Sequence, residues 1–106
     1  MARFLFTATY TVEGINGLMQ DGAARRVEVI RALVENTGGR MESLHFGLGP
    51  YDAYVICDLP DQQTAIALAI TIRAAGGLET RINPLLTPEE VDEALRVNTT
   101  YRSPGA

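Results

Sequence analysis

The chain has 106 residues with nine basic and thirteen acidic side chains, and therefore a net charge of −4. This length is typical of one globular domain. The single Cys57 excludes an internal disulfide, and the single His45 excludes a multi-histidine zinc site within one chain. The acidic balance argues against a nucleic-acid-binding function, because binding to phosphates requires a basic surface.

The two ends of the sequence bear on location. The apolar run at residues 1–6 is too short for a signal peptide or a membrane span, and polar threonines follow it at once. We therefore expect no membrane association and a cytoplasmic protein of a bacterial cell, in keeping with an unpaired cysteine. We expect one domain over residues 1–97 and a tail over 98–106, in which Tyr101 is compatible with a frayed end or with an arm docked on a neighbouring subunit.

The first half of the chain predicts a strand, a helical region and a second strand. Residues 3–10 alternate in polarity and are rich in aromatic and Thr residues, which is typical of a strand. A helical region follows, weakened in its first half by three glycines and regular in its hydrophobic pattern over residues 23–34. Gly38-Gly39 ends it, and residues 40–47 form the next strand.

The second half predicts a hairpin, two helices and a last strand. Residues 47–50 form a turn before a strand at 52–58. Asp61 is an N-cap for an apolar helix with its body at 64–75, which Gly76-Gly77 ends. A strand at 78–85 precedes a short helix that begins at Thr87-Pro88 and runs to about Val97.

This order of elements, β-α-β-β-α-β with a terminal helix, predicts an α+β fold of the ferredoxin-like type. Its four strands form one antiparallel sheet in the order 4-1-3-2, with both main helices on one face. The helix at 64–75 has almost no polar stripe, so we expect either the terminal helix or another subunit to cover it.

Alternation along the strands places mixed side chains on the second face of the sheet. Glu79 and Arg81 suit water there, whereas Leu5, Met41 and Tyr54 do not. Such a mixture is typical of a wet, partly apolar interior between two sheets. We therefore predict a homodimer that packs these faces into a dimeric α/β barrel, closed by a two-fold axis.

The same face gathers candidate functional residues at one end. In the functional interpretation, Asp52 orients His45, His45 transfers a proton, and Arg81 holds an anionic group of the substrate. The predicted ligand-binding residues are Thr7, Thr9, Tyr54, Glu79 and Arg81. In the structural interpretation, Asp52–His45 and Glu79–Arg81 are ion pairs within a polar interface, and Asp52 closes the hairpin. The sequence identifies no cofactor and no metal motif, although haem binding through His45 is a further hypothesis.

Short glycine-based motifs give a resemblance to a known family. They are Tyr10-Thr11-x-x-Gly14 with Gly17, Gly38-Gly39, Gly49-Pro50-Tyr51-Asp52, Gly76-Gly77 and Pro88-Glu89-Glu90. In this order the chain, over most of residues 4–96, resembles the GYD domain family of small bacterial proteins. The family's Gly-Tyr-Asp is interrupted here by Pro50. The resemblance implies a ferredoxin-like dimeric α/β barrel and does not imply an activity.

Two functions of different classes follow. In the first, a homo-oligomer binds a small molecule inside the barrel, with or without acid–base chemistry through His45 and Asp52. In the second, the protein is a non-catalytic structural or regulatory assembly module, whose contact surfaces are the apolar second helix and the tail.

Overall fold

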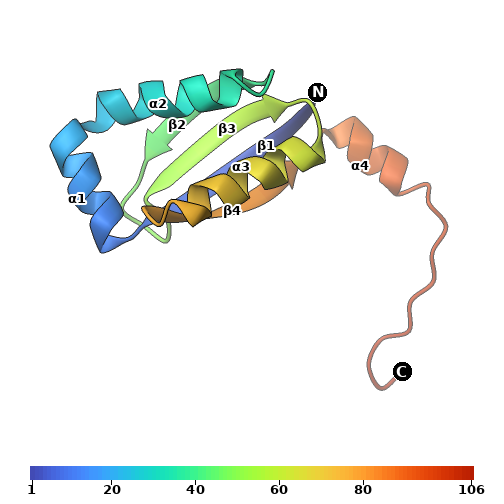
Figure 1. Ribbon diagram of the computed structural model, residues 1–106. Coiled ribbons are helices and arrows are strands. Elements are labelled where there is room, and N and C mark those ends of the chain that lie inside the picture. Colours follow the sequence, from blue (N-terminus) through green and yellow to red (C-terminus); the bar gives the residue numbers. More distant parts are fainter.

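A computed structural model describes all residues from 1 to 106, which form four strands and four helices. The elements are β1 (Ala2–Tyr10), α1 (Val12–Asp21), α2 (Ala23–Glu35), β2 (Arg40–Phe46), β3 (Ala53–Leu59), α3 (Gln62–Ala74), β4 (Leu78–Leu85) and α4 (Pro88–Ala94). The strands form one antiparallel sheet in the order β2-β3-β1-β4 (Figure 1). This confirms the predicted α+β ferredoxin-like fold, because 4-1-3-2 is the same order counted from the other edge.

Three of the four helices begin at polar caps. The side chains of Thr11, Asp61 and Thr87 accept hydrogen bonds from backbone N–H groups in the first turns of α1, α3 and α4. The first helical region differs from the prediction because it is divided into two helices. Gly22, with φ of 86°, breaks it between α1 and α2, since this φ is costly for any residue with a Cβ.

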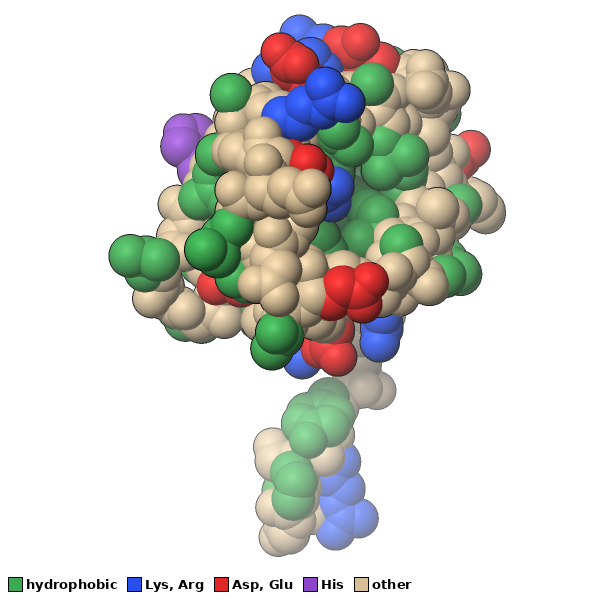
Figure 2. Space-filling view, turned by 60° about the vertical axis from the view of Figure 1, so that its left-hand side comes forward, with side chains coloured by type: hydrophobic (Ala, Val, Ile, Leu, Met, Phe, Trp, Pro, Cys, Tyr) green, Lys and Arg blue, Asp and Glu red, His purple; other side chains and the backbone are tan.

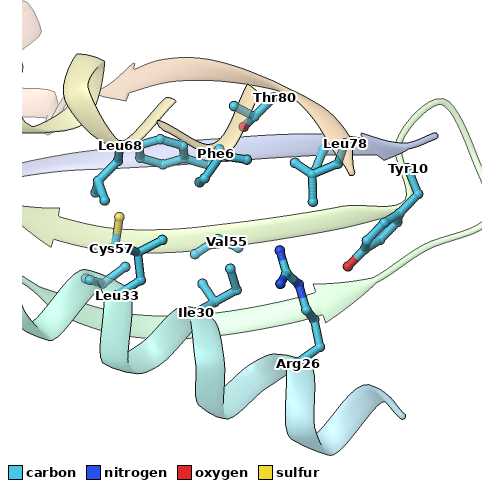
Figure 3. Close-up of a pocket in the computed structure, with 13 residues that line it drawn as sticks. Phe6, Tyr10, Arg26, Ile30, Leu33, Val55, Cys57, Leu68, Leu78 and Thr80 are labelled. Carbon is cyan, nitrogen blue, oxygen red and sulfur yellow. The ribbon is translucent and has the colours of Figure 1, made fainter. Parts of the chain in front are cut away.

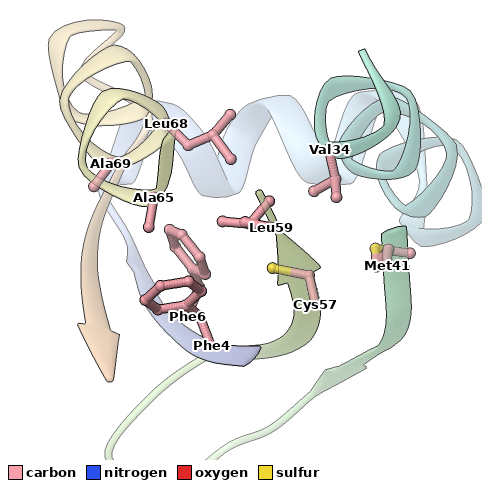
Figure 4. Close-up of a cluster of buried hydrophobic side chains, with 9 residues drawn as sticks. All are labelled: Phe4, Phe6, Val34, Met41, Cys57, Leu59, Ala65, Leu68 and Ala69. Carbon is pink, nitrogen blue, oxygen red and sulfur yellow. The ribbon is translucent and has the colours of Figure 1, made fainter. Parts of the chain in front are cut away.

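The hydrophobic core lies between the sheet and the two long helices, α2 and α3. Side chains of β1 and β3 point up from the sheet to meet those of the helices (Figure 4). The core consists of Phe4, Phe6, Val34, Met41, Cys57, Leu59, Ala65, Leu68 and Ala69. Figure 4 also shows that α2 and α3 stand apart on the same side of the sheet. Side chains fill the space between the two helices only in part, because pockets lined by residues of both helices remain there.

The position of Met41 corrects one prediction. Alternation places Met41 on the face without helices, but the structure buries it in the core with 3% exposure. A register shift between Met41 and Ser43 is the cause: Met41 pairs with Cys57, and Ser43 pairs with the preceding residue, Ile56. One extra residue on β2 reverses the parity of the strand at that point.

The terminal helix α4 does not cover α3. Every residue of α4 is exposed, and the helix and the following residues project away from the body of the domain (Figure 1). Ile66 and Ile70 on α3 stay 45% and 63% exposed. We expected either the terminal helix or another subunit to cover the apolar helix α3. Within one chain, the terminal helix does not cover it.

Candidate functional site

The candidate site lies on the open face, by which we mean the face of the sheet that carries no helix. Four of its side chains form one row across the four strands. His45 pairs with Tyr54, Tyr54 with Thr7, and Thr7 with Arg81. Direct cross-strand neighbours on one face have their Cβ atoms about 5 Å apart. The structure therefore brings together four of the predicted site residues.

Thr7 is the residue in this row with unmet hydrogen-bonding capacity. It is 4% exposed, and its Oγ1 has no hydrogen-bond partner. Buried polar groups are nearly always hydrogen-bonded, and an unsatisfied one costs roughly 1–3 kcal/mol. Its neighbour Thr80, which is also buried, is satisfied because its hydroxyl donates to the carbonyl oxygen of Thr7 at 2.9 Å. The hydroxyl of Thr7 therefore has no hydrogen-bond partner within the chain.

The charged side chains around Thr7 also have no partner within the chain. His45, Glu79 and Arg81 are exposed and form no ion pair or side-chain hydrogen bond within the chain. Glu79 pairs in register with Thr9 at the next position along the sheet. Glu79 and Arg81 do not form the ion pair of the structural interpretation. This end of the open face thus carries a guanidinium and an imidazole, neither paired within the chain, beside the buried hydroxyl of Thr7.

Asp52 has a structural role in the chain. Its carboxylate accepts a hydrogen bond from the backbone N–H of Tyr10 at 2.8 Å, and its own N–H donates to the carbonyl oxygen of Ala8 at 2.8 Å. Its carbonyl oxygen accepts from the N–H of Gly47 at 2.9 Å. Asp52 forms no ion pair with His45. The structure therefore supports the interpretation of Asp52 as the residue that closes the hairpin, and it gives no orienting contact to His45.

Tyr54 is held in place by its surroundings. Its ring packs edge-on against Tyr51, with centroids 6.1 Å apart and planes at 88°. A Cβ at Gly47 would lie 3.1 Å from the Tyr54 ring. Because the hairpin turn fixes this ring, Tyr54 supplies a rigid wall beside Thr7.

The opposite end of the open face carries a network that sequence reasoning missed. Asp58 binds Arg3 at 3.1 Å and Arg40 at 3.3 Å, and Arg3 also binds Glu42 at 3.0 Å. Hydrogen bonds from Arg3 and Arg40 hold the pKa of the Asp58 carboxyl below its usual range. Since these charges satisfy one another, this end of the face is a self-contained polar cluster. The register Arg3–Asp58–Arg40 follows directly from strand order and could have been predicted.

The helix side of the sheet contains an apolar groove between α2 and α3, which sequence reasoning also missed. Its floor includes Val55 and Cys57, and it continues outward along the facing sides of the two helices. Figure 3 shows the side chains of Arg26 and Tyr10 at one end of it, with Cys57 and Leu33 towards the other. Burial raises the pKa of the Cys57 thiol to about 11, with a further rise from Asp58, so this cysteine is an inert core residue rather than a nucleophile.

No three His, Cys, Asp or Glu side chains come together as metal ligands. None of the helices combines the length and the apolar character that crossing a membrane requires.

Three of the motifs named above, at residues 10–14, 49–52 and 76–77, meet at one end of this sheet. The hydroxyl of Thr11 lies 3.0 and 3.1 Å from the carbonyl oxygens of Gly76 and Gly77, and its N–H donates to Gly77 at 3.1 Å. Asp52 reaches the same corner through Tyr10. The motifs therefore hold together the end of β1, the hairpin and the start of β4.

Sheet order, helix placement and this corner define a ferredoxin-like α+β domain. The chain belongs to the GYD domain family, whose model matches residues 4–95. Comparison with curated proteins found no match, and neither did comparison with solved structures.

Proposed function

We propose that this protein is a homodimer that binds a small anionic molecule between two facing open sheets. The observation that carries the proposal is the buried, unpartnered hydroxyl of Thr7. Arg81 and His45 stand in the same row and are equally uncommitted. A second sheet laid over this row would exclude water and would strengthen each of these interactions with a ligand.

The apolar members of the open face support the dimer. Leu5 and Ile56 pair with each other in the middle of the face and are only partly buried in one chain. They separate the satisfied Asp58 cluster from the row of His45, Tyr54, Thr7 and Arg81. Covering this strip with the same strip of a second copy buries apolar surface on both sides, as a two-fold interface requires.

In this proposal His45 carries any proton transfer, because the imidazole of histidine is the side chain that most often serves as a general acid or base. Arg81 binds the anionic group and Thr7 donates a hydrogen bond to the ligand. Asp52 acts by fixing the hairpin that holds His45 and Tyr54. If a substrate is found, its turnover is measured in a folded His45→Ala, Asp52→Asn double variant. An unchanged turnover rate would contradict the catalytic part of the proposal.

Light scattering tests the dimer. We expect a mass of at least twice 11.5 kDa for the full chain. Ile56→Lys places a charge on the open face and should reduce the mass, whereas Val12→Lys, at an 82% exposed position of α1, should not. Circular dichroism shows whether each variant is folded. A folded wild-type monomer would contradict the proposal.

Thermal-shift screening with aliphatic and aromatic carboxylates and with inorganic phosphate tests the ligand site. A ligand at 100 times its Kd stabilises the folded protein by about 2.7 kcal/mol. We expect Thr7→Val and Arg81→Leu to abolish the shift, and Arg73→Leu, a matched exposed arginine on α3, to keep it. A shift that survives in the first two variants would place the ligand elsewhere.

The second candidate function is a non-catalytic assembly module. The projecting α4 and the exposed Ile66 and Ile70 favour it, since large exposed apolar patches mark interaction sites. A large defined assembly without any ligand in the screen would favour this function over the first.

A further inference from the structure

Two surfaces of this chain are unpartnered and complementary. The first is the groove, which we define by Ile30 and Leu33 of α2, Leu68 and Ile72 of α3, and Val55 and Cys57 of β3. Eleven of the thirteen residues that line it are hydrophobic. Figure 2 shows hydrophobic side chains lining a hollow in this surface, with both basic and acidic side chains around it.

Arg26 gives the groove a polar end. It is half-buried and lines the groove, yet its guanidinium forms no ion pair and no hydrogen bond within the chain. Tyr10 lies at the same end, and its hydroxyl has no hydrogen bond either. A charge at the edge of apolar surface is normally paired, so the groove calls for an occupant with an apolar stripe and a carboxylate.

The second surface is the C-terminal arm, which we define as residues 86–97. Its apolar side chains are exposed: Leu86 61%, Val91 43%, Leu95 77% and Val97 65%. Val91 and Leu95 are four residues apart and lie on one side of the helix. The charged residues of α4 are all acidic, and the one basic residue of the arm, Arg96, follows the helix; the acidic residues are Glu89, Glu90, Asp92 and Glu93. The arm therefore has the apolar stripe and the carboxylates that the groove requires.

The local structure directs the arm away from its own domain. Only Leu86 and Thr87 separate β4 from α4. Thr87 is committed to a capping box, in which its N–H donates to Glu90 Oε1 at 2.9 Å and its Oγ1 accepts from the Glu90 N–H at 3.1 Å. This cap and Pro88 fix where the helix begins, and the two-residue connection leaves little length for α4 to turn back over its own domain. The arm projects clear of the domain in Figures 1 and 2.

We propose that the arm of one copy docks in the groove of a second copy. Val91 and Leu95 pack between α2 and α3, and an acidic side chain of α4 pairs with Arg26. Asp92 is the suited partner, because it is next to Val91 and is not used by the cap. This contact involves the helix side of the domain and does not depend on the proposed dimer through the open face.

Cross-linking of full-length chains tests the contact directly. Leu33→Cys and Leu95→Cys are prepared as separate variants, mixed and oxidised. We expect a disulfide-linked species of twice the chain mass that contains one of each variant, and no such species when Val12→Cys replaces Leu95→Cys. The native Cys57 is fully buried and stays unreacted. Absence of the mixed species would overturn the proposal.

A Leu33→Cys, Leu95→Cys double variant distinguishes the second copy from the same chain. If oxidation joins the two cysteines only within monomers, the arm occupies its own groove and the proposal is wrong. Stabilisation of the protein by decanoate, without any cross-link in the mixture, would instead assign the groove to amphipathic carboxylates and would also overturn the proposal.

Charge reversal gives an independent readout by light scattering. Arg26→Glu should weaken the arm-dependent association at least tenfold, and the matched Arg73→Glu on α3 should leave it unchanged. Adding Asp92→Arg to Arg26→Glu should restore it. An assembly that depends on Ile56 but not on Arg26 or Leu95 would retain the open-face dimer and exclude the arm contact, so the two proposals fail separately.

Discussion

Gly14 lies directly against the backbone of Gly77. A Cβ at Gly14 would stand 1.7 Å from the carbonyl oxygen of Gly77 and 2.7 Å from its carbonyl carbon. The approach is held by Thr11, which caps α1 and binds the same Gly76-Gly77 segment. A helix that begins on top of another backbone turn needs a residue without a side chain at the contact.

Gly14→Ala should therefore destabilise the protein. The added methyl group meets a backbone carbonyl, which cannot move aside as a flexible side chain would. We expect a loss of about 1–3 kcal/mol in the free energy of unfolding, measured by urea denaturation. Gly17→Ala is the matched control, since nothing lies within 4 Å of its Cβ position and Ala favours a helix interior by about 0.5–1 kcal/mol. Equal effects at the two positions would contradict this account.

Asp52 should contribute to stability whatever its role in a reaction. Asp52→Ala leaves the N–H of Tyr10 without its acceptor and should cost about 1.5–3 kcal/mol, the range for a hydrogen bond to a charged group. Asp52→Asn keeps an acceptor oxygen in place and should cost less. Chemical denaturation of the two variants checks this order. An Asn variant as unstable as the Ala variant would mean that the negative charge, rather than the hydrogen bond, matters.

The fold follows from the sequence because its signals are local and repeat along the chain. Alternation defines the strands, and Asp61 and Thr87 start their helices as polar caps. The predicted face of Met41 was wrong because a β-bulge in β2 reverses the alternation of side chains, and the polarity pattern of the sequence does not reveal such a bulge. The division at Gly22 depends on a single positive φ, although the three glycines in that region had already weakened the expected helix.

The sequence predicts which face of the sheet carries the candidate site residues, but it does not predict which atoms they contact. Strand order and parity place Thr7, Tyr54, His45 and Arg81 in one row, which the register bears out. They do not say that Asp52 binds the backbone of Tyr10, because a carboxylate's choice between a side chain and an N–H depends on ångström-scale geometry. The groove was missed because it arises from the spacing of α2 and α3. Arg26, next to the apolar positions of α2, was the signal that could have indicated it.

Cys57 should make stability fall at alkaline pH. Burial raises the pKa of its thiol to about 11 in the folded protein, while an unfolded thiol ionises at about pH 8.5. The folded state therefore binds the thiol proton more tightly than the unfolded state does. The resulting contribution to the free energy of unfolding is fully present below about pH 8.5 and is lost as the pH rises towards 11. Denaturation curves from pH 8 to 11 should show this loss, and Cys57→Ala should reduce it. Rapid alkylation of the folded protein by iodoacetamide at pH 8 would contradict the burial.

Asp58 should act in the opposite direction at acid pH. Hydrogen bonds from Arg3 and Arg40 lower the pKa of its carboxyl, so the folded state favours the ionised form. The resulting stability is present above the ordinary carboxyl pKa of about 3.9 and disappears as the pH falls through the lower folded value. Asp58→Asn should lose this component, which denaturation between pH 2 and 5 would reveal. High salt should weaken the effect in the wild type, because the network is partly exposed.

Thr7→Val should stabilise the ligand-free protein, which would be unusual for a change at a buried polar residue. The substitution preserves shape and removes a buried hydroxyl that has no partner, so we expect a gain of about 1 kcal/mol and a rise in Tm of several degrees. Thr80→Val is the matched control on the neighbouring strand. It removes the hydrogen bond to the Thr7 carbonyl and should cost about 1 kcal/mol. A loss of stability in Thr7→Val would mean that the hydroxyl is already satisfied in solution. A gain in stability, together with loss of the ligand-induced rise in Tm, would show that Thr7 serves binding and lowers the stability of the fold.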